Sequence, residues 1–177
     1  MIVERLAGER FVDTNVLVYL FDSDAPEKAR RSRELLSASG NVLSTQVLQE
    51  FYAVVTRKLS PPLRPADAQA ALRQFTRLCR VVTLDAPLVL AAARRSAEEQ
   101  VSFWDALVVE AARSAGCRVL LTEDLHHGRV FDERLVVHDP YVDVSGAGLA
   151  SDGPGRLPRG RVHRPFRAKS GARRRKA

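Results

Sequence analysis

The sequence predicts an α/β protein of three layers, α/β/α, with a central and mostly parallel sheet. Short apolar segments of strand-like composition alternate with longer segments of helical period over residues 9–140, and no internal repeat is present. Strands that alternate with helices are typical of a parallel sheet covered by helices on both faces. A chain of 177 residues, 45% of them hydrophobic, is long enough to build one such core.

The five predicted strands are short and mostly apolar. The first, residues 9–13, ends in an aspartate, and the fourth, residues 118–122, is followed by a glutamate and an aspartate. The other predicted strands cover residues 41–44, 80–83 and 135–138. Polar sites of parallel α/β sheets lie beyond the carboxyl ends of the strands, so the residues that follow the strands are the first candidates for function.

Five helices are predicted from the 3.6-residue period and from signals at their ends. Asp24 as N-cap and Pro26 in the first turn begin the first helix, and Gly116 at the C′ position ends the last. The predicted helices cover residues 25–38, 45–59, 66–78, 86–99 and 102–115.

The net charge of +7 is distributed unevenly along the chain. Residues 1–150 hold 18 Lys and Arg against 20 Asp and Glu, whereas residues 151–177 hold 10 against 1. The last segment is rich in Gly, Pro and Arg, so it cannot bury enough apolar surface to offset the entropy of ordering. We therefore expect a folded domain over residues 1–144 and a disordered basic tail over residues 145–177. Such a tail can hold RNA phosphates without recognising a sequence.

Two further features bound the class of protein. The sequence has no uncharged apolar run of about 18 residues and no basic leader followed by an apolar stretch, so we expect a cytoplasmic protein without a membrane partner. Cys79 and Cys117 stand far apart beside apolar residues. This spacing excludes a CxxC motif or a zinc knuckle and predicts two buried thiols.

Four carboxylates from distant parts of the chain are predicted to converge at one edge of the sheet. Asp13 and Asp124 follow strands whose carboxyl ends point the same way. Glu50 lies at the margin of the apolar face of its helix, and Asp105 lies one turn from the start of another helix.

Each acid also has a purely structural interpretation. The pair Ser102-x-x-Asp105 resembles a capping box, and Asp13 could cap a helix that opens directly after it. Glu50 could be a half-solvated residue at a helix margin, and Asp124 could begin an Asx turn. These interpretations do not explain why both Asp13 and Asp124 interrupt apolar segments at strand exits, where burying a carboxylate without a partner is expensive.

Four segments together resemble the PIN-domain ribonucleases, and most of all the VapC toxins of bacterial toxin-antitoxin pairs. They are FVDTNVLVYLFD, STQVLQEFYAV, SFWDALVVEAARSAGC and LLTEDL, and the resemblance covers residues 9–141. Order, spacing and context agree with the family: an apolar strand into Asp-Thr-Asn, an acid within a helix, Trp-Asp-Ala-Leu at a helix start and Thr-x-Asp after a strand. The basic tail has no counterpart in that pattern.

The resemblance implies a PIN-like fold and a metal-dependent endoribonuclease, the toxin of a pair, whose antitoxin covers the acidic groove. We also expect a homodimer. The implied metal-binding and catalytic residues are Asp13, Glu50, Asp105 and Asp124, with Asp13 and Asp105 as the most direct ligands. The residues implied to orient these carboxylates are Thr14, Asn15 and Thr122. Oxygen ligands without a His or Cys cluster favour Mg²⁺ or Mn²⁺, and such ions suit phosphodiester hydrolysis by an activated water.

Several alternatives stay open at this point. Glu123 is adjacent to Asp124, and we prefer Asp124 because neighbouring side chains on a turn point in different directions. The Asp-Thr-Asn segment also resembles the phosphotransfer loop of haloacid-dehalogenase-like phosphatases, but Asn15 stands where those enzymes have a second acid. The alternative functions are a PIN-fold RNA-processing nuclease without an antitoxin and a non-enzymatic RNA-binding protein that acts through its tail. The presence of all four acids disfavours the latter.

Overall fold

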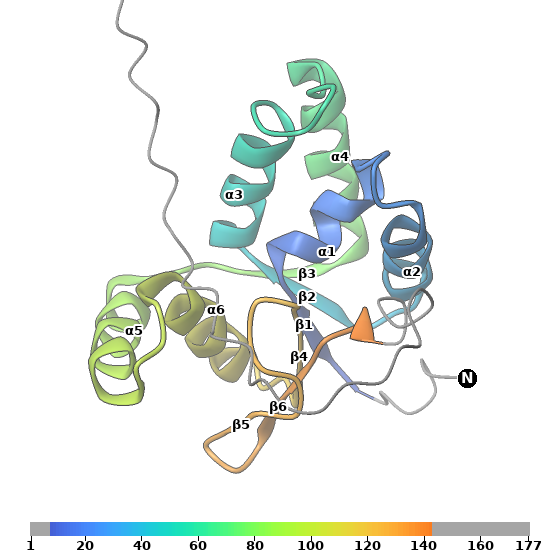
Figure 1. The fold of residues 1–177 in the computed structure, drawn as a ribbon. Coiled ribbons are helices and arrows are strands. Elements are labelled where there is room, and N and C mark those ends of the chain that lie inside the picture. The colour runs from blue at the N-terminus through green and yellow to red at the C-terminus, as the bar shows by residue number, and fades with distance from the viewer. Residues whose placement is uncertain (1–7, 143–177) are drawn as a thin grey trace, which may run out of the picture.

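A computed structural model describes residues 8–142, which form a six-stranded sheet with helices around it (Figure 1). The strands are β1 (Arg10–Val12), β2 (Asn41–Ser44), β3 (Arg80–Val82), β4 (Val119–Leu121), β5 (Val130–Phe131) and β6 (Leu135–His138). The helices are α1 (Thr14–Val18), α2 (Pro26–Ser37), α3 (Thr45–Val55), α4 (Pro65–Leu78), α5 (Ala86–Glu99) and α6 (Phe103–Ser114), and the 3₁₀ helix η2 (Tyr19–Phe21) follows α1. The tail predicted over residues 145–177 lies outside the described residues.

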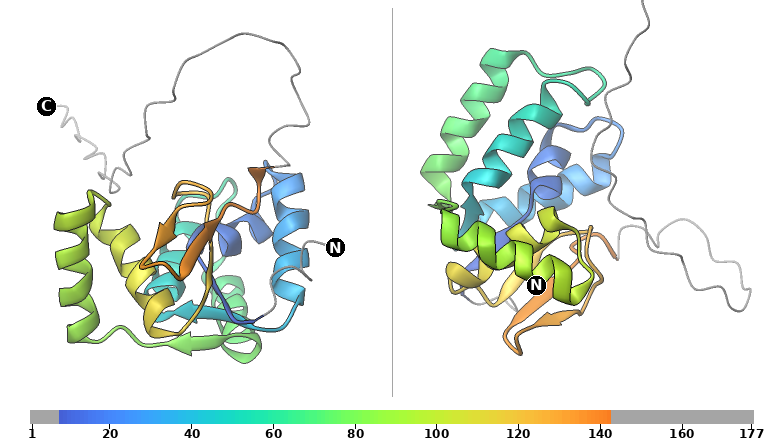
Figure 2. Two further views of the ribbon diagram at one scale, coloured as in Figure 1. Left: turned by 90° about the horizontal axis from the view of Figure 1, so that it is seen from below. Right: turned by 90° about the vertical axis from the view of Figure 1, so that its left-hand side faces the viewer.

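The order of the strands in the sheet is β3-β2-β1-β4-β6-β5. All neighbouring pairs are parallel except β5 with β6, which is antiparallel. Helices α5 and α6 lie on one side of the sheet and α2 on the other, while α3 and α4 rise beyond the carboxyl ends of the strands (Figures 1 and 2). The predicted α/β/α architecture with a mostly parallel sheet is therefore confirmed.

The core lies where the central strands meet the helices. Phe11 of β1 and Leu120 of β4 are fully buried neighbours in the sheet, as expected for parallel strands that are covered on both faces. The ring of Phe51 on α3 packs against Phe21 of η2 and Phe75 of α4, with centroid separations of 5.7 and 5.1 Å. These aromatic contacts fix α3, which carries one of the predicted acids, over the end of the sheet.

Some local features differ from the sequence-based prediction. Helix α1 with η2, and the short strand β5, were not predicted, because elements of two to five residues are too short to display a period. The helix expected over residues 45–59 ends at Val55, where the chain turns back and the amide of Leu63 donates to the Val55 carbonyl. Ala25 rather than Asp24 is the N-cap of α2, and no side chain caps that helix. The predicted burial of Cys79 and Cys117 as free thiols is confirmed.

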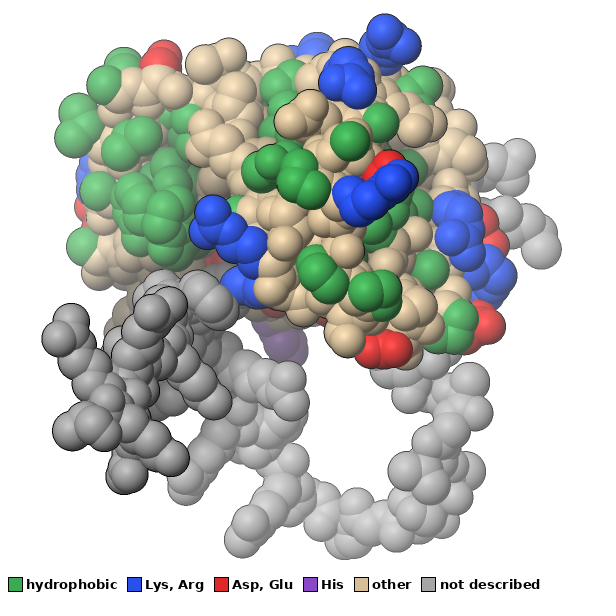
Figure 3. All heavy atoms as spheres, turned by 90° about the horizontal axis from the view of Figure 1, so that it is seen from above, with side chains coloured by type: hydrophobic (Ala, Val, Ile, Leu, Met, Phe, Trp, Pro, Cys, Tyr) green, Lys and Arg blue, Asp and Glu red, His purple; other side chains and the backbone are tan. Residues whose placement is uncertain are grey.

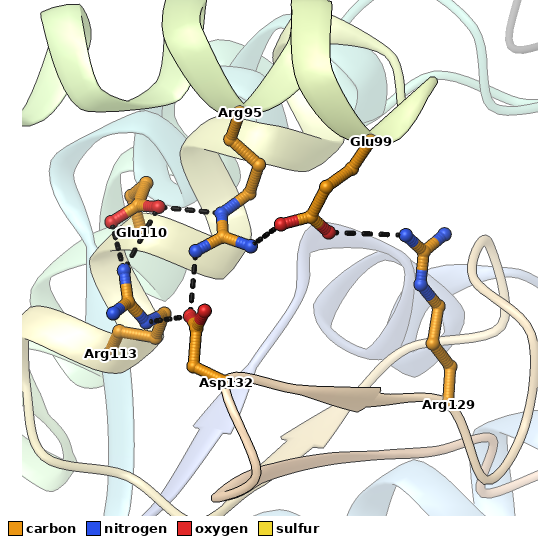
Figure 4. A network of polar contacts seen from close by, with 6 residues as sticks. All are labelled: Arg95, Glu99, Glu110, Arg113, Arg129 and Asp132. Atoms are coloured by element: carbon orange, nitrogen blue, oxygen red, sulfur yellow. Dashed lines mark hydrogen bonds and ion pairs between the residues drawn. The ribbon is translucent and has the colours of Figure 1, made fainter.

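A network of charged side chains fastens the turn between β5 and β6 to helices α5 and α6 (Figure 4). Its members are Arg95, Glu99, Glu110, Arg113, Arg129 and Asp132. Arg95 has a 7% exposed side chain and donates to Glu110 at 2.6 Å and to Asp132 at 2.7 Å. Arg113 also reaches Asp132, at 2.5 Å. Asp132 has a positive φ of 47°, and its two guanidinium partners hold this turn in place.

The surface of the described part of the chain is of mixed character. On the face seen in Figure 3, Lys and Arg side chains lie among hydrophobic and acidic ones rather than in one basic patch. The excess of positive charge therefore belongs to the sequence after residue 150. Within residues 8–142 there is no helix of the length and apolarity that a membrane crossing requires.

Candidate active site

The four predicted acids line a single cleft of about 280 Å³. Each comes from a different part of the fold: the exit of β1, the middle of α3, the first turn of α6 and the exit of β4. The residues are, in that order, Asp13, Glu50, Asp105 and Asp124. We call this cleft the acidic cleft. Asp22 is a fifth carboxylate in its lining, and Lys58 is the only Lys or Arg among the described residues that line it. A cleft with this balance of charge attracts cations.

Asp13 is a buried acid of the cleft, with 7% of its surface exposed. Its Oδ1 accepts a hydrogen bond of 2.7 Å from the amide of Thr14, at the start of α1. Loss of hydration raises the pKa of Asp13 to about 7, against the effect of hydrogen bonds from Thr122 and Thr14, and the charges of Asp124 and Glu50 raise it further. Asp13 therefore caps α1 and also faces the other acids, so the capping interpretation and the site interpretation are compatible.

Thr122 and Asn15 connect Asp13 to Asp124 by a chain of hydrogen bonds. The hydroxyl of Thr122, a fully buried residue, donates to Asp13 Oδ2 at 2.7 Å. Asn15 Nδ2 lies 3.1 Å from both Thr122 Oγ1 and Asp124 Oδ2. The amide of Asp124 also donates to Thr122 Oγ1, at 3.1 Å. Thr122 and Asn15, which the family resemblance implied as supporting residues, therefore contact the acids that they were expected to orient.

Glu50 belongs to a row of residues that reach the cleft at intervals of four. Gln46, Glu50 and Val54 on α3, and Lys58 in the turn that follows α3, all line it. The hydroxyl of Thr14 donates to Glu50 Oε2 at 3.1 Å, which is the third hydrogen bond between the side chain of an expected supporting residue and the carboxylate of an acid. Sequence reasoning missed Gln46 and Lys58, although their spacing from Glu50 matched the helical period.

Asp105 occupies the first turn of α6, as predicted. Ser102 is the N-cap, and its hydroxyl oxygen accepts from the Asp105 amide at 3.1 Å and donates to Asp105 Oδ2 at 2.7 Å. The capping interaction proposed as an alternative is thus present, while the carboxylate also lines the cleft. The amide groups at the start of α6 favour a negative charge there. Trp104, beside Asp105, lines the cleft with 49% of its surface exposed, and the sequence marked it only as a member of the Trp-Asp-Ala-Leu motif at a helix start.

Glu123 has a different environment from Asp124. It accepts a hydrogen bond from the hydroxyl of Tyr19 and forms an ion pair of 2.5 Å with Lys28. Lys28 also donates to the Tyr19 hydroxyl, at 2.8 Å. Glu123 is therefore engaged at the side of the cleft, whereas Asp124 lines it.

The donor set of the acidic cleft suits a hard divalent cation. Besides the carboxylates, two buried amide oxygens at the cleft, Asn15 Oδ1 and Gln46 Oε1, have no hydrogen-bond partner. Such oxygens are the ligands and acceptors that Mg²⁺ and its waters prefer. Within residues 8–142 no three carboxylate, imidazole or thiol side chains stand close enough to form a complete ligand group. The fit to a hard cation therefore rests on the chemistry of the oxygens that line the cleft.

Known proteins resemble this chain in sequence pattern and in fold. The family profile described as PIN domain matches residues 10–132. VapC20 of Mycobacterium tuberculosis, described as a toxin that cleaves the sarcin-ricin loop, is 22% identical with a TM-score of 0.50, over 63% of this chain and 87% of that chain. A toxin-antitoxin complex from Klebsiella pneumoniae is 16% identical with a TM-score of 0.56, over 75% of this chain and 98% of that chain. DNA-bound VapBC from Salmonella typhimurium is 18% identical with a TM-score of 0.54, over the same shares, 75% and 98%. No curated protein sequence gives a match.

Proposed function

The chain belongs to the PIN-domain family, and from this premise we propose that it is a metal-dependent endoribonuclease that hydrolyses the phosphodiester bonds of RNA. Members of the family are in general nucleases that use divalent metal ions. The observation that carries the proposal is the meeting of four carboxylates in one cleft, three of them bonded to polar residues of neighbouring elements. A structural role alone does not require acids from four separate segments to face one another.

We assign a separate role in the reaction to each of the main residues of the acidic cleft. A Mg²⁺ or Mn²⁺ ion held by these acids would supply positive charge for the phosphate and would activate a water for attack. Asp13 and Asp105 are proposed as its most direct ligands, and either Glu50 or Asp124 as the more distant acid that holds a second ion or the attacking water. The hydroxyls of Thr122 and Thr14 keep two of these carboxylates aligned through their hydrogen bonds. This reaction needs no protein nucleophile.

Two residues of the cleft are suited to the binding of single-stranded RNA. Lys58 carries a positive charge that attracts a phosphate into a lining otherwise dominated by acids. Trp104 presents a half-exposed indole on which an unpaired base can stack. Bases in a duplex are already stacked on one another, so this pair of residues favours an unpaired segment as the substrate.

We further propose that the protein is the toxin of a toxin-antitoxin pair. The structures from Klebsiella pneumoniae and Salmonella typhimurium, which share its fold, are assemblies of toxin with antitoxin. An antitoxin that covers the acidic cleft would exclude both the cation and the RNA. The homodimer and the cytoplasmic location expected from the sequence are part of this proposal.

The test compares RNA cleavage by purified wild type and Asp105→Asn, each with Mg²⁺, with Mn²⁺ and with chelator. Wild type should cleave a defined single-stranded RNA only with metal, and Asp105→Asn should not cleave, since asparagine keeps the shape of the side chain and loses its charge. Ser102→Ala is the matched control. It removes the cap and the hydrogen bond to Asp105 Oδ2 at a cost of about 1 kcal/mol in stability but keeps the charge of all four acids, so it should retain metal-dependent cleavage at a reduced rate. Cleavage by Asp105→Asn at the wild-type rate would leave Asp105 with a capping role alone.

The assignment as a toxin has its own test. Induced expression of the wild type should arrest growth, Asp105→Asn should not, and co-expression of a small protein encoded beside the gene should restore growth. Normal growth under strong induction of an active nuclease would favour a role in RNA processing without an antitoxin.

A further inference from the structure

Gln46, a polar residue of the acidic cleft, has a buried oxygen without a hydrogen-bond partner, and the proposed reaction gives this residue no role. Gln46 lies on α3, one turn before Glu50, and lines the cleft although only 7% of its surface is exposed. Its Oε1 atom is buried without a hydrogen-bond partner. Buried acceptors without partners are rare in folded proteins because the loss of hydration is not compensated. The oxygen therefore points to a partner from outside the chain.

The hydrogen bond made by Nε2 determines the orientation of the Gln46 amide. Nε2 donates to the backbone carbonyl of Trp104 at 3.4 Å. Turning the amide over would place its oxygen against that carbonyl oxygen, so the nitrogen belongs on this side. Gln46 thereby links α3 to the first turn of α6, which carries Asp105, and its oxygen has no partner within the described part of the chain.

The chemistry of the cleft restricts what a partner from outside the chain can be. The acids around Gln46 are acceptors when ionised and cannot donate to another oxygen. Lys58 lies in the turn beyond the end of α3 and does not donate to Gln46 Oε1, which has no hydrogen-bond partner among residues 8–142. The phosphate diester of RNA has no donor, and the donors that RNA does carry are its 2′-hydroxyls and the amino groups of its bases. The waters that surround a divalent cation are strong donors, and Mg²⁺ keeps several of its waters when it binds to proteins.

We propose that Gln46 is a positioning residue for the catalytic cation, whose hydration shell donates a hydrogen bond to Gln46 Oε1. This inference rests on the proposed function, because it needs a cation at the acids. It adds a neutral residue from α3 to the residues that decide where the ion sits. It also gives the same side chain a second task, since the amide nitrogen keeps the acid-bearing turn of α6 next to α3.

The test measures Mn²⁺ affinity by electron paramagnetic resonance together with the melting temperature of the metal-free protein. Gln46→Leu should lower Mn²⁺ affinity about tenfold, the size typical for residues that act on a metal through its first ligands. The melting temperature without metal should change little, because the loss of the long hydrogen bond to the Trp104 carbonyl is offset by the removal of a buried acceptor that had no partner. Gln46→Glu keeps an acceptor and should bind Mn²⁺ at least as tightly as wild type. Gln49→Leu, on the exposed side of the same helix, is the control and should change neither quantity.

Several outcomes would overturn the inference. Wild-type Mn²⁺ affinity in Gln46→Leu, with weaker binding of RNA in chelator, would show that the oxygen serves the substrate. Wild-type affinity with a lower melting temperature would show that Gln46 only ties α3 to α6. Asp105→Asn in the same titration separates this inference from the proposed function. If Asp105→Asn loses Mn²⁺ binding and Gln46→Leu does not, the inference alone fails, whereas absence of binding by wild type would overturn both.

Discussion

The hydroxyl of Thr122 donates a hydrogen bond of 2.7 Å to Oδ2 of Asp13, although the two residues are 109 positions apart. They meet because β1 and β4 are parallel neighbours in which Val12 stands opposite Leu121, so both strands leave the sheet side by side. The Asp13 amide completes the junction by donating to the Leu121 carbonyl at 3.0 Å. Asp13 can interrupt an apolar segment here because the register of β1 against β4 places the Thr122 hydroxyl within hydrogen-bonding distance of its carboxylate.

Thr122→Val should weaken both the fold and metal binding. The substitution keeps the volume of the side chain but leaves Asp13 Oδ2 without its donor, and the stability should fall by about 1–3 kcal/mol as measured by denaturant unfolding. Mn²⁺ affinity should fall as well, because the carboxylate is no longer aligned. Thr122→Ser retains the hydroxyl and should remain near wild type in both measurements. Equal stability of the Val and Ser variants would show that the hydrogen bond to Asp13 contributes nothing.

The metal-free protein should be more stable near pH 5 than near pH 8. Burial raises the pKa of Asp13 to about 7, so the folded protein holds this proton more tightly than the unfolded chain does. The stabilising contribution is complete below the unfolded pKa of about 4 and is lost as the pH rises through 7. Between pH 5 and pH 7 the loss is roughly 2–3 kcal/mol, and melting curves in chelator measure it.

Asp13→Asn supplies the control for this pH dependence. It should remove most of the loss, raise the melting temperature of the metal-free protein at pH 8 and abolish cleavage. Added Mn²⁺ should raise the melting temperature of wild type much more than that of the variant, since a ligand stabilises only the state that binds it. A lower melting temperature of Asp13→Asn in chelator at pH 8, with equal shifts on adding metal, would limit Asp13 to the capping of α1.

Asp124→Asn and Glu123→Gln should affect cleavage in different ways. Asp124 lines the acidic cleft, whereas Glu123 is held by Tyr19 and Lys28, so loss of charge at position 124 should lower the cleavage rate and loss at 123 should leave it close to wild type. Cleavage rates of the two variants at saturating Mg²⁺ decide between the acids. The opposite result would move the site by one residue along the turn.

Arg95→Met should destabilise the fold without changing the chemistry. Arg95 is a buried centre of the network in Figure 4, and its removal leaves Glu110 with fewer partners in a buried place, which should cost about 3 kcal/mol in denaturant unfolding. Arg113→Met is the matched control, since that side chain is 38% exposed and its loss should cost less. None of the six network residues lines the acidic cleft. The cleavage rate of folded Arg95→Met at saturating RNA should therefore equal that of wild type.

Deletion of residues 151–177 should weaken RNA binding and leave turnover unchanged at saturating RNA. The segment contributes ten basic residues against one acidic residue, so its loss should also flatten the dependence of RNA binding on salt. Binding titrations at two salt concentrations and cleavage rates at saturation measure the two effects. A truncated protein that bound RNA normally but had lost turnover would assign the segment to the active site.

The sequence by itself determined the class of fold and the identity of the candidate acids. Alternating strand-like and helix-like periods predicted a parallel sheet between helices, because each period records which face of an element is apolar. The acids were visible because Asp13 and Asp124 interrupt apolar segments at strand ends, and because the surrounding motifs resemble the family to which the chain belongs. The division between a nearly neutral domain and a basic end also followed from composition alone.

Only the tertiary structure decided which residues surround those acids. Helix α1 is too short to display a period, and the partners of Asp13, Asp124 and Glu123 are about 100 positions away in sequence. Gln46 and Trp104 come together at the cleft because α3 packs beside the start of α6, a relation that no local pattern records. A sequence period fixes the face that an element buries. The packing of elements fixes which side chains that face meets, and with it the pKa of Asp13 and the unsatisfied oxygen of Gln46.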